Sequence, residues 1–297
     1  MNLLVTGAWS DGKNHTAELE AMGHIVTFMQ YEKDALPCDY EWVEGVICNG
    51  LFLTHPIEKF TNLKYIQLTS AGFDRVDMNY VKAHNIEIHN ARGVYSIPMA
   101  EFAVAGVLQL YKQSRCFYEN QKAHRWEKHR GLLELWGKTV TIVGCGSVGA
   151  ECAKRFKAFG CRVIGVNRTV REDVDFETIL PLDQLDEILP KTDVLILTVA
   201  LTPETTHLMD RRRLDMLPGT AVVVNIARGA VLDENTIRKM LLNGELYGAV
   251  LDVFENEPLP ESDPLWDAPN VIATPHNSFV GEGNGERLAR IIMKRMT

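Results

Sequence analysis

A G-x-G-x-x-G motif, Gly144-Cys145-Gly146-Ser147-Val148-Gly149, follows an apolar run at residues 139–143 and precedes a helical pattern at residues 151–159. Another apolar run, residues 162–166, predicts the next buried strand. In a strand–turn–helix unit, the first glycine permits the tight turn, the second lets the backbone approach phosphate, and the third lets the helix pack closely on the strand. The helix N-terminus offers the anion unpaired N–H groups and a positive dipole end. We therefore predict dinucleotide binding here.

Apolar runs alternate with helical patterns along the rest of the chain, which is typical of parallel sheets wound by helices. The runs form two series, at residues 3–5, 25–28, 45–48, 65–68 and 87–89, and then at residues 139–143, 162–166, 194–199, 221–225, 248–251 and 271–273. This order predicts an α/β protein with two doubly wound, Rossmann-like domains built on parallel sheets.

A long helical segment, residues 96–118, separates the two series. It opens at Ser96, and Pro98 is tolerated in its first turn. With hinges near Gly93 and Asn277, residues 1–92 and 278–297 form the expected flavodoxin-like, substrate-binding domain. Residues 93–277 form the expected dinucleotide-binding Rossmann domain.

Composition limits the classes of partner. The chain has 297 residues, of which 46% are apolar and 24% charged, as in soluble globular proteins. Its net charge of −8 argues against nucleic acid or an anionic membrane as the main partner. No apolar run approaches the roughly 18 residues of a membrane span. The six cysteines are scattered without a C-x-x-C pair, and the N-terminus lacks a basic leader, so we expect a cytoplasmic protein with buried thiols.

Three polar residues follow apolar runs in the second half of the chain. Arg228 comes after residues 221–224, Glu257 after residues 248–251, and His276 after residues 271–273. Carboxyl ends of parallel strands are where open α/β sheets bind ligands. Arginine can hold a carboxylate and polarise a neighbouring carbonyl, histidine can give or take a proton, and a carboxylate can orient the imidazole and favour its protonated form. Beside a dinucleotide site, this set predicts hydride transfer.

At this point the chain resembles the D-isomer-specific 2-hydroxyacid dehydrogenase family over nearly its whole length. The matching segments are Gly144 to Gly149, Leu201-Thr202-Pro203-Glu204-Thr205, Asn225-Ile226-Ala227-Arg228-Gly229, Asp252-Val253-Phe254-Glu255-Asn256-Glu257-Pro258 and Thr274-Pro275-His276. The resemblance implies that Arg228 binds the substrate carboxylate, His276 is the acid/base and Glu257 is its partner.

The resemblance also implies further contacts. Asp252 matches a family position close to the nicotinamide carboxamide. The segment Thr69-Ser70-Ala71-Gly72-Phe73-Asp74 resembles a loop of the smaller domain whose Ala71 and Gly72 N–H groups approach the substrate carboxylate. The expected cofactor-binding residues are Gly144, Gly146, Ser147, Val148, Gly149, Asn167, Arg168, Thr169, Ala200, Ala227 and Asp252.

Two features depart from the family pattern. NAD-preferring members carry an acidic residue after the second Rossmann strand, whereas this chain has Asn167-Arg168-Thr169. Arg168 offers a fork suited to the 2′-phosphate of NADP, and the alternative is a solvated Arg168 with Asn167 bound to the 2′-OH of NAD. The chain also stops at Thr297, soon after a helical segment at residues 287–296, which leaves the C-terminal packing open.

The substrate pocket is expected to include Asn49 and Gly50, together with Ser70, Ala71 and Gly72. Leu51, Phe52, Tyr95 and Phe279 complete a candidate pocket that is uncharged and partly apolar, without a second cation for a diacid or a phosphate. Glyoxylate, hydroxypyruvate, pyruvate and larger oxoacids stay open. Residues 109–135 resemble the family's dimerisation arm, which implies a homodimer.

These observations predict reduction of a 2-oxoacid to the (R)-2-hydroxyacid, with NADPH preferred and NAD possible, in a cleft between the two domains. Such an enzyme belongs to the EC 1.1.1 class. Two alternatives remain: NAD-dependent oxidation of a 2-hydroxyacid, and a non-catalytic NAD(P)-binding sensor that resembles the corepressors sharing this fold. No metal is expected, because His124 and His129 have no cysteine or carboxylate at metal-ligand spacing.

Overall fold

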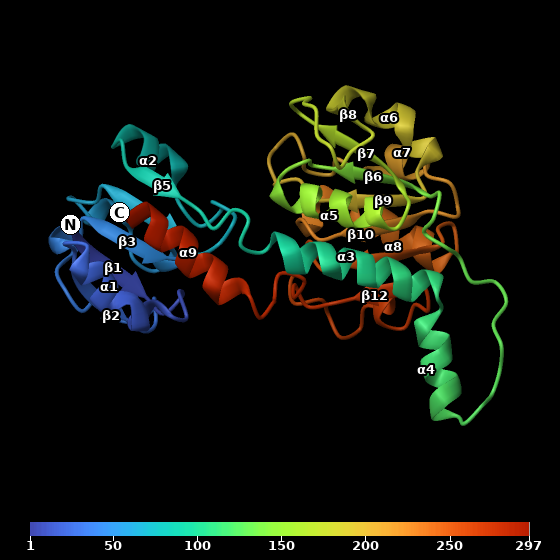
Figure 1. Cartoon of the computed structure of the whole chain (residues 1–297), viewed down its shortest axis with the longest axis horizontal. Helices are drawn as coiled ribbons and strands as arrows, with labels where there is room; N and C mark the ends of the chain where they lie inside the picture. Colours follow the sequence, from blue (N-terminus) through green and yellow to red (C-terminus); the bar gives the residue numbers. More distant parts are fainter. Residues whose placement is uncertain (297) are drawn as a thin grey trace. The chain divides into compact units, whose positions relative to one another are not determined.

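The computed structural model describes residues 1–296, and their contacts form two compact units (Figure 1). The first unit contains Met1–Tyr95 and the segment from Gly281 onward, and the second contains Ser96–Val280. Both limits lie three residues after the boundaries expected from the sequence, Gly93 and residue 278. Each unit is an α/β fold on a parallel sheet, as predicted.

The first unit has a five-stranded sheet in the order β2-β1-β3-β4-β5, which is the flavodoxin-like order. Its strands are β1 (Asn2–Thr6), β2 (Ile25–Met29), β3 (Gly45–Cys48), β4 (Tyr65–Leu68) and β5 (Glu87–His89). Its α-helices are α1 (Thr16–Ala21), α2 (Met78–Ala83) and α9 (Asn284–Met296). Short 3-10 turns are η1 (Gly12–His15), η2 (Tyr40–Trp42), η3 (Leu51–Leu53) and η4 (Ile57–Lys59).

Helix α9 packs on the sheet of the first unit. Its buried residues Leu288 and Ile292 join the same apolar cluster as Leu3 and Val5 of β1. Arg295 Nη1 also donates to Gln67 Oε1 and to the Asn90 carbonyl, both at 2.8 Å. The last helix therefore packs on the first unit through an apolar face and one anchoring guanidinium.

The second unit has a seven-stranded sheet in the order β12-β11-β10-β9-β6-β7-β8, so the chain reverses direction of winding at β6. Its strands are β6 (Thr139–Val143), β7 (Arg162–Asn167), β8 (Thr178–Pro181), β9 (Val194–Leu197), β10 (Val222–Asn225), β11 (Gly248–Leu251) and β12 (Val271–Ala273). Its α-helices are α3 (Ser96–Tyr111), α4 (Ser114–Lys122), α5 (Ser147–Ala158), α6 (Leu185–Ile188), α7 (Arg211–Leu214) and α8 (Glu234–Leu242). Its 3-10 turns are η5 (Leu182–Gln184), η6 (Leu189–Lys191), η7 (Gly229–Val231) and η8 (Pro264–Trp266).

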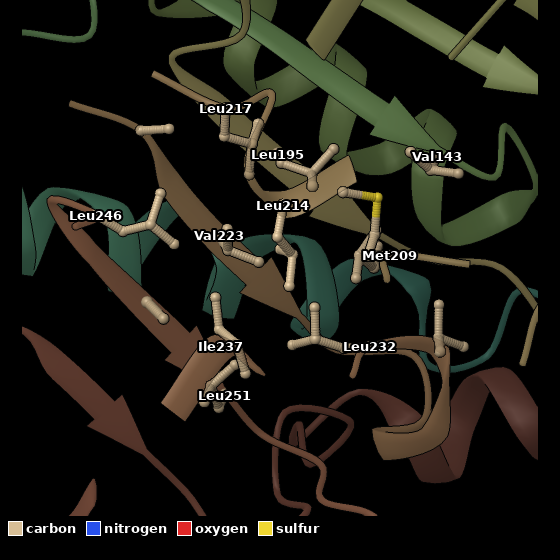
Figure 2. Close-up of a cluster of buried hydrophobic side chains, with 14 of the residues drawn as sticks. Val143, Leu195, Met209, Leu214, Leu217, Val223, Leu232, Ile237, Leu246 and Leu251 are labelled. Carbon is tan, nitrogen blue, oxygen red and sulfur yellow. The ribbon is translucent and has the colours of Figure 1, made fainter. Parts of the chain in front are cut away.

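Alternate residues of the central strands face opposite layers of this unit, as the two-residue period of a strand requires. Val222 and Val224 of β10 belong to the cluster built with α3 and α5. Val223, between them, belongs to the opposite cluster, which Figure 2 shows with Ile237 of α8 and Leu214 of α7. Both faces of the sheet are therefore covered by helices, and the carboxyl ends of the strands are the place where a ligand can bind.

Two elements differ from the sequence-based expectation. The helix expected over residues 96–118 is two helices, because Gln113 adopts the left-handed conformation with φ of 54°. Helix α4 then extends away from the sheet (Figure 1). Strand β8 was not predicted. Among the α-helices of residues 1–296, none has the length and apolar character needed to cross a membrane.

Candidate active site

The glycine-rich turn lies between β6 and α5, and each glycine meets a different steric demand. Gly144 has φ of +103°, a conformation that disfavours other residues. A Cβ on Gly149 would lie 2.1 Å from the Gly144 carbonyl oxygen, so only glycine lets α5 begin so close to the strand. A Cβ on Gly146 would meet nothing within 4 Å. The turn thus leaves open space at Gly146, where a pyrophosphate would need to approach the backbone.

Helix α5 begins at Ser147, with Val148 and Gly149 in its first turn. This is four residues earlier than the predicted start. No acidic residue lies in that first turn, so the positive end of the helix dipole is not neutralised locally. An open glycine, a 12-residue helix and a non-acidic N-terminus fit the pyrophosphate of a dinucleotide.

The loop after β7 contacts the glycine turn through two side chains. Asn167 Oδ1 accepts from the Cys145 N–H at 3.3 Å, and its Nδ2 donates to the Thr169 carbonyl at 2.9 Å. Arg171 Nη2 donates to the Cys145 carbonyl at 2.8 Å. Arg171 was not singled out from the sequence, although it is the next cation after Arg168. The structure therefore adds a second guanidinium at the turn.

Arg168 and Ala200 are exposed at the carboxyl ends of β7 and β9. The pKa of Glu204 lies below its usual range, mainly through a hydrogen bond with Thr202, and attraction to the Arg168 guanidinium adds to this. The charges of Arg168, after β7, and of Glu204, in the loop after β9, therefore interact electrostatically. Ala200 accepts a hydrogen bond from Thr205 Oγ1 at 2.7 Å through its carbonyl.

His276 and Glu257 meet at the carboxyl edge of the same sheet. His276 Nδ1 lies 2.9 Å from Glu257 Oε2, and Glu257 Oε1 accepts from the Phe254 N–H at 3.1 Å. The side chains are 41% and 38% exposed, so a ligand can reach the pair. Because Glu257 occupies Nδ1, Nε2 is the ring atom left to face a substrate.

Asp252 holds the loop that carries His276. The side chain is fully buried, and its carboxylate accepts from Thr274 Oγ1 at 2.7 Å and from the N–H groups of Asn277 and Ser278 at 2.8 and 2.9 Å. The His276 N–H donates to the Asp252 carbonyl at 2.8 Å, and His276 has φ of 51°. The expected contact of Asp252 with a cofactor stays a prediction, whereas its role in shaping this loop is a direct observation.

Arg228 follows β10 and is half-buried. Its Nη1 donates to the Ala227 carbonyl at 2.7 Å. The Asn225 side chain holds the same turn, because it accepts a hydrogen bond from the Ala227 N–H and donates one to the Arg228 carbonyl. A Cβ on Gly229 would lie 1.9 Å from the carbonyl carbon of Phe254. Glycine therefore lets the Arg228 turn press directly on the loop that carries Glu257.

A network of ion pairs and hydrogen bonds braces the loop that carries Glu257. Glu255 and Glu234 each accept from the other's N–H, at 3.4 and 2.6 Å. Arg238 donates to Glu234 at 2.6 Å and to Asp263 at 2.8 Å. Glu255 also pairs with His207 Nε2 at 2.9 Å. The sequence analysis did not identify this brace, because its members are up to 56 residues apart (207 to 263) and only the fold brings them together.

In the first unit, the loop after β3 is held by a carboxylate that the sequence analysis missed. Glu32 accepts from the Asn49 N–H and the Gly50 N–H at 2.7 Å each, and from Thr6 Oγ1 at 2.7 Å. Asn49 Oδ1 is buried without a hydrogen-bond partner among residues 1–296. Glu32 follows the end of β2, so the strand-end signal that identified Arg228 would also have found it.

The loop after β4 presents backbone groups. Ser70 Oγ donates to the Gly72 carbonyl at 3.1 Å, and Asn90 Nδ2 donates to the Ala71 carbonyl at 2.5 Å. In the part of the chain that the structure describes, the Ala71 and Gly72 N–H groups have no hydrogen-bond partner. The expected substrate loops, Asn49–Gly50 and Ser70–Gly72, thus follow the neighbouring strands β3 and β4.

The expected catalytic and cofactor-binding residues all belong to the second unit, and they follow neighbouring strands. Strand β10 pairs with β11 and β11 with β12, which brings the Arg228, Glu257 and His276 loops to one edge. Strand β6, with the glycine turn, pairs with β9, which in turn pairs with β10. This edge can bind a dinucleotide, hold an anionic substrate and move a proton.

Comparison with protein families matches this chain to one family twice. The D-isomer specific 2-hydroxyacid dehydrogenase NAD binding domain matches residues 104–278, which include Arg228, Glu257 and His276. The catalytic domain of the same family matches residues 10–169.

Individual proteins agree with that match. A glyoxylate reductase from Korarchaeum cryptofilum is 31% identical over 261 residues, covering 84% of this chain and 79% of that protein. A D-isomer specific 2-hydroxyacid dehydrogenase from Xanthobacter autotrophicus, in complex with NADPH and MES, superimposes with a TM-score of 0.78 and 28% identity over 99% of this chain and 94% of the other. D-lactate dehydrogenase from Aquifex aeolicus, complexed with NAD and lactic acid, superimposes with a TM-score of 0.82 and is 25% identical, and the superposition covers 99% of this chain and 94% of the other. This chain therefore belongs to the D-isomer specific 2-hydroxyacid dehydrogenase family, as an oxidoreductase with a nicotinamide cofactor.

Proposed function

We propose that this protein reduces a 2-oxoacid to the (R)-2-hydroxyacid and prefers NADPH as the cofactor. The observation that carries the proposal is the 2.9 Å pair of His276 and Glu257, which stands with Arg228 at the sheet edge that also bears the open glycine turn. Reduction and oxidation use the same groups, so an enzyme that runs as a hydroxyacid oxidase would keep these assignments.

Each residue has one task in this reaction. The bound nicotinamide supplies the hydride. The Arg228 guanidinium holds the substrate carboxylate and polarises the adjacent carbonyl. His276 donates its Nε2 proton to the developing alkoxide, while the Glu257 carboxylate at Nδ1 stabilises the imidazolium.

The test is a panel of 2-oxoacids, including glyoxylate, hydroxypyruvate and pyruvate, assayed by NADPH oxidation with wild type and Arg228→Ala. We expect turnover by the wild type and a loss of kcat/KM of at least roughly 10- to 100-fold in the variant, since a charge-assisted contact is removed. Arg162→Ala, an exposed arginine paired with Glu177, is the matched control. Tight NADPH binding without turnover on any oxoacid would instead support the non-catalytic sensor.

The NADPH preference rests on Arg168. It is exposed at the end of β7, where an acidic residue would repel a 2′-phosphate, and Arg171 adds a second cation at the glycine turn. The structural relative from Xanthobacter autotrophicus binds NADPH, and the one from Aquifex aeolicus binds NAD, so relatives alone do not decide the choice.

The cofactor preference is tested by kcat/KM for NADPH and NADH in wild type and Arg168→Ala. We expect the variant to lose roughly 10- to 100-fold with NADPH and much less with NADH, because a charge-assisted pair with phosphate is removed. Asn167→Asp should act in the same direction. A wild type that prefers NADH, or equal losses with both cofactors, would assign Asn167 to the ribose hydroxyl of NAD.

We further propose a homodimer formed through α4 and the segment after it. A cavity of about 720 Å³ lies there, lined by Phe117, Asn120, Gln121 and residues 124–130. Trp126 is 97% exposed, and Arg125, Lys128 and Arg130 give this arm a positive charge in a chain whose net charge is −8. A second copy supplies the acidic surface to match. Trp126→Ser should shift the molar mass measured by light scattering toward the monomer.

A cytoplasmic location completes the proposal. Cys48, Cys145, Cys152 and Cys161 are buried free thiols, which fits a reducing compartment.

A further inference from the structure

Glu32 carries a charge that no cation balances. Its three hydrogen-bond donors, the Asn49 N–H, the Gly50 N–H and Thr6 Oγ1, are all neutral groups. Among residues 1–296, no lysine, arginine or histidine forms an ion pair with it. Near the expected active site, Glu257 faces His276 and Asp263 faces Arg238, whereas buried Asp252 is held, like Glu32, by neutral donors.

The Glu32 carboxylate is fixed in place by three hydrogen bonds, two from backbone N–H groups and one from a hydroxyl. Its field also reaches Cys48 at the end of β3, where the pKa of the thiol is raised first by burial and then by the Glu32 charge. A fixed negative charge therefore sits directly behind the Asn49–Gly50 loop.

The same loop is where the substrate side chain is expected, so this inference rests on the proposed function. Both N–H groups of the loop are already taken by Glu32, and they cannot bind an anion. We propose that Glu32 is a specificity-determining residue that selects oxoacids whose side chain is uncharged and excludes those with a second anionic group.

The expected size of the selection follows from simple electrostatics. A like charge about 12 Å away, at an effective dielectric constant of about 20, lowers affinity roughly tenfold, and a closer one lowers it more. A methyl or hydroxymethyl group at the same place meets no such repulsion. Selection therefore acts on the far end of the substrate, whereas in the proposed reaction the shared carboxylate is bound by Arg228.

The test uses pairs of compounds that differ only at that far end. Oxaloacetate and 2-oxobutanoate share the reacting oxoacid and end in a carboxylate and a methyl group. For binding without turnover, N-oxalylglycine and N-ethyloxamate differ in the same way. We expect wild type to favour 2-oxobutanoate and N-ethyloxamate. In Glu32→Gln, the ratio of kcat/KM for oxaloacetate to that for 2-oxobutanoate should rise about tenfold, and the ratio of affinities should rise in parallel.

Two further variants separate charge from loop structure. Thr6→Val removes one hydrogen bond to Glu32 and keeps the Glu32 carboxylate. If the loop merely loosens, kcat/KM should fall for oxaloacetate and for 2-oxobutanoate alike, and the ratio of the two values should stay unchanged. Glu20→Gln removes an exposed charge of α1 and should change nothing. An unchanged ratio in Glu32→Gln, or the same ratio change in Thr6→Val, would overturn the proposal. If wild type reduces no oxoacid, the proposed reaction fails, and the affinity ratios still decide the role of Glu32.

Discussion

At the carboxyl edge of the seven-stranded sheet, His276 stands opposite the carboxylate of Glu257 at 2.9 Å. At the same edge of the five-stranded sheet, the three donors to Glu32 are neutral groups, and the Ala71 and Gly72 N–H groups of the loop after β4 have no hydrogen-bond partner among residues 1–296. Both edges come from parallel sheets with similar connections. The fold therefore provides the place, while the loop residues decide what each place does.

The difference suggests a division of labour. The second unit carries groups that can transfer a proton and bind anions, and it fixes them with buried or half-buried partners such as Asp252 and Asn225. In the first unit, the loop after β3 is instead fixed through its backbone N–H groups by Glu32. Chemistry needs fixed charges of both signs, whereas selectivity can be set by one charge of the wrong sign for competing substrates. Four variants or measurements test this contrast.

The largest effect is expected at His276. His276→Asn should lower kcat/KM by about 10²- to 10⁴-fold, because the general acid is lost while asparagine tolerates the left-handed backbone. His207→Asn is a matched control, since His207 also has positive φ, 48° against 51°, and also lies 2.9 Å from a glutamate. We expect at most a twofold change there (about 0.4 kcal/mol), within the range of surface substitutions. Similar losses in both variants would mean that the edge has been assigned wrongly.

Thiol labelling compares the two units as they unfold. Burial raises the pKa of Cys145 and Cys152 to about 12, and that of Cys48 well above its usual range. Against the ordinary value of 9.0, this leaves about a thousandfold less thiolate at a given pH, so these thiols should react only after unfolding. Cys116, which is partly exposed, should react at once.

Labelling in increasing urea then reports each unit separately. The first unit is smaller and buries a lower share of its surface, so we expect Cys48 to react at a lower urea concentration than Cys145 and Cys152. Simultaneous reaction of all three would show that the units unfold as one body.

The contrast also shows how far sequence patterns carry. Strands at residues 45–48 and 248–251 were predicted to the residue, because each is a glycine followed by three apolar side chains and then a polar residue, and such a short apolar run indicates a strand buried on both faces. Strand β8 was missed because Thr178 and Pro181 flank only two apolar residues, which is weak for an edge strand. The helix break at Gln113 carries no glycine or proline to mark it.

Site residues follow the same logic. His276, Glu257 and Arg228 were picked out because strand ends share an edge, and the structure places them there. Asp252 and Glu32 both follow a strand, which marks them as candidate residues, but their structural roles could not be predicted. Both bind backbone N–H groups, which every residue offers, so the sequence of the bound loop carries no sign of the contact.

Glycine substitutions test packing at the two edges. Gly149→Ala places a Cβ 2.1 Å from the Gly144 carbonyl oxygen, so the second unit should lose about 1–3 kcal/mol of stability through overpacking. Gly50→Ala meets Leu53 Cδ1 at 3.4 Å and Glu32 Oε2 at 3.5 Å, which are ordinary contacts. Its stability should change by less than about 0.5 kcal/mol. Urea unfolding followed by circular dichroism measures both, and equal losses would contradict the difference in packing between Gly149 and Gly50.

The smallest effect is expected at Glu257. Glu257→Gln keeps an oxygen for His276 Nδ1 and removes the charge that stabilises the imidazolium. Because the two side chains are 38% and 41% exposed, solvent screens the pair, and kcat/KM should fall only about two- to fivefold. Glu255→Gln, two residues away and paired with His207, is the matched control and should leave kcat/KM unchanged. A loss as large as that of His276→Asn would mean that Glu257 does more than orient the ring, for example by taking part in the proton transfer itself. No loss would mean that the side chain at residue 257 only positions the imidazole and that its charge has no effect on the reaction. The hydrogen bond from the Phe254 N–H already holds this side chain in place.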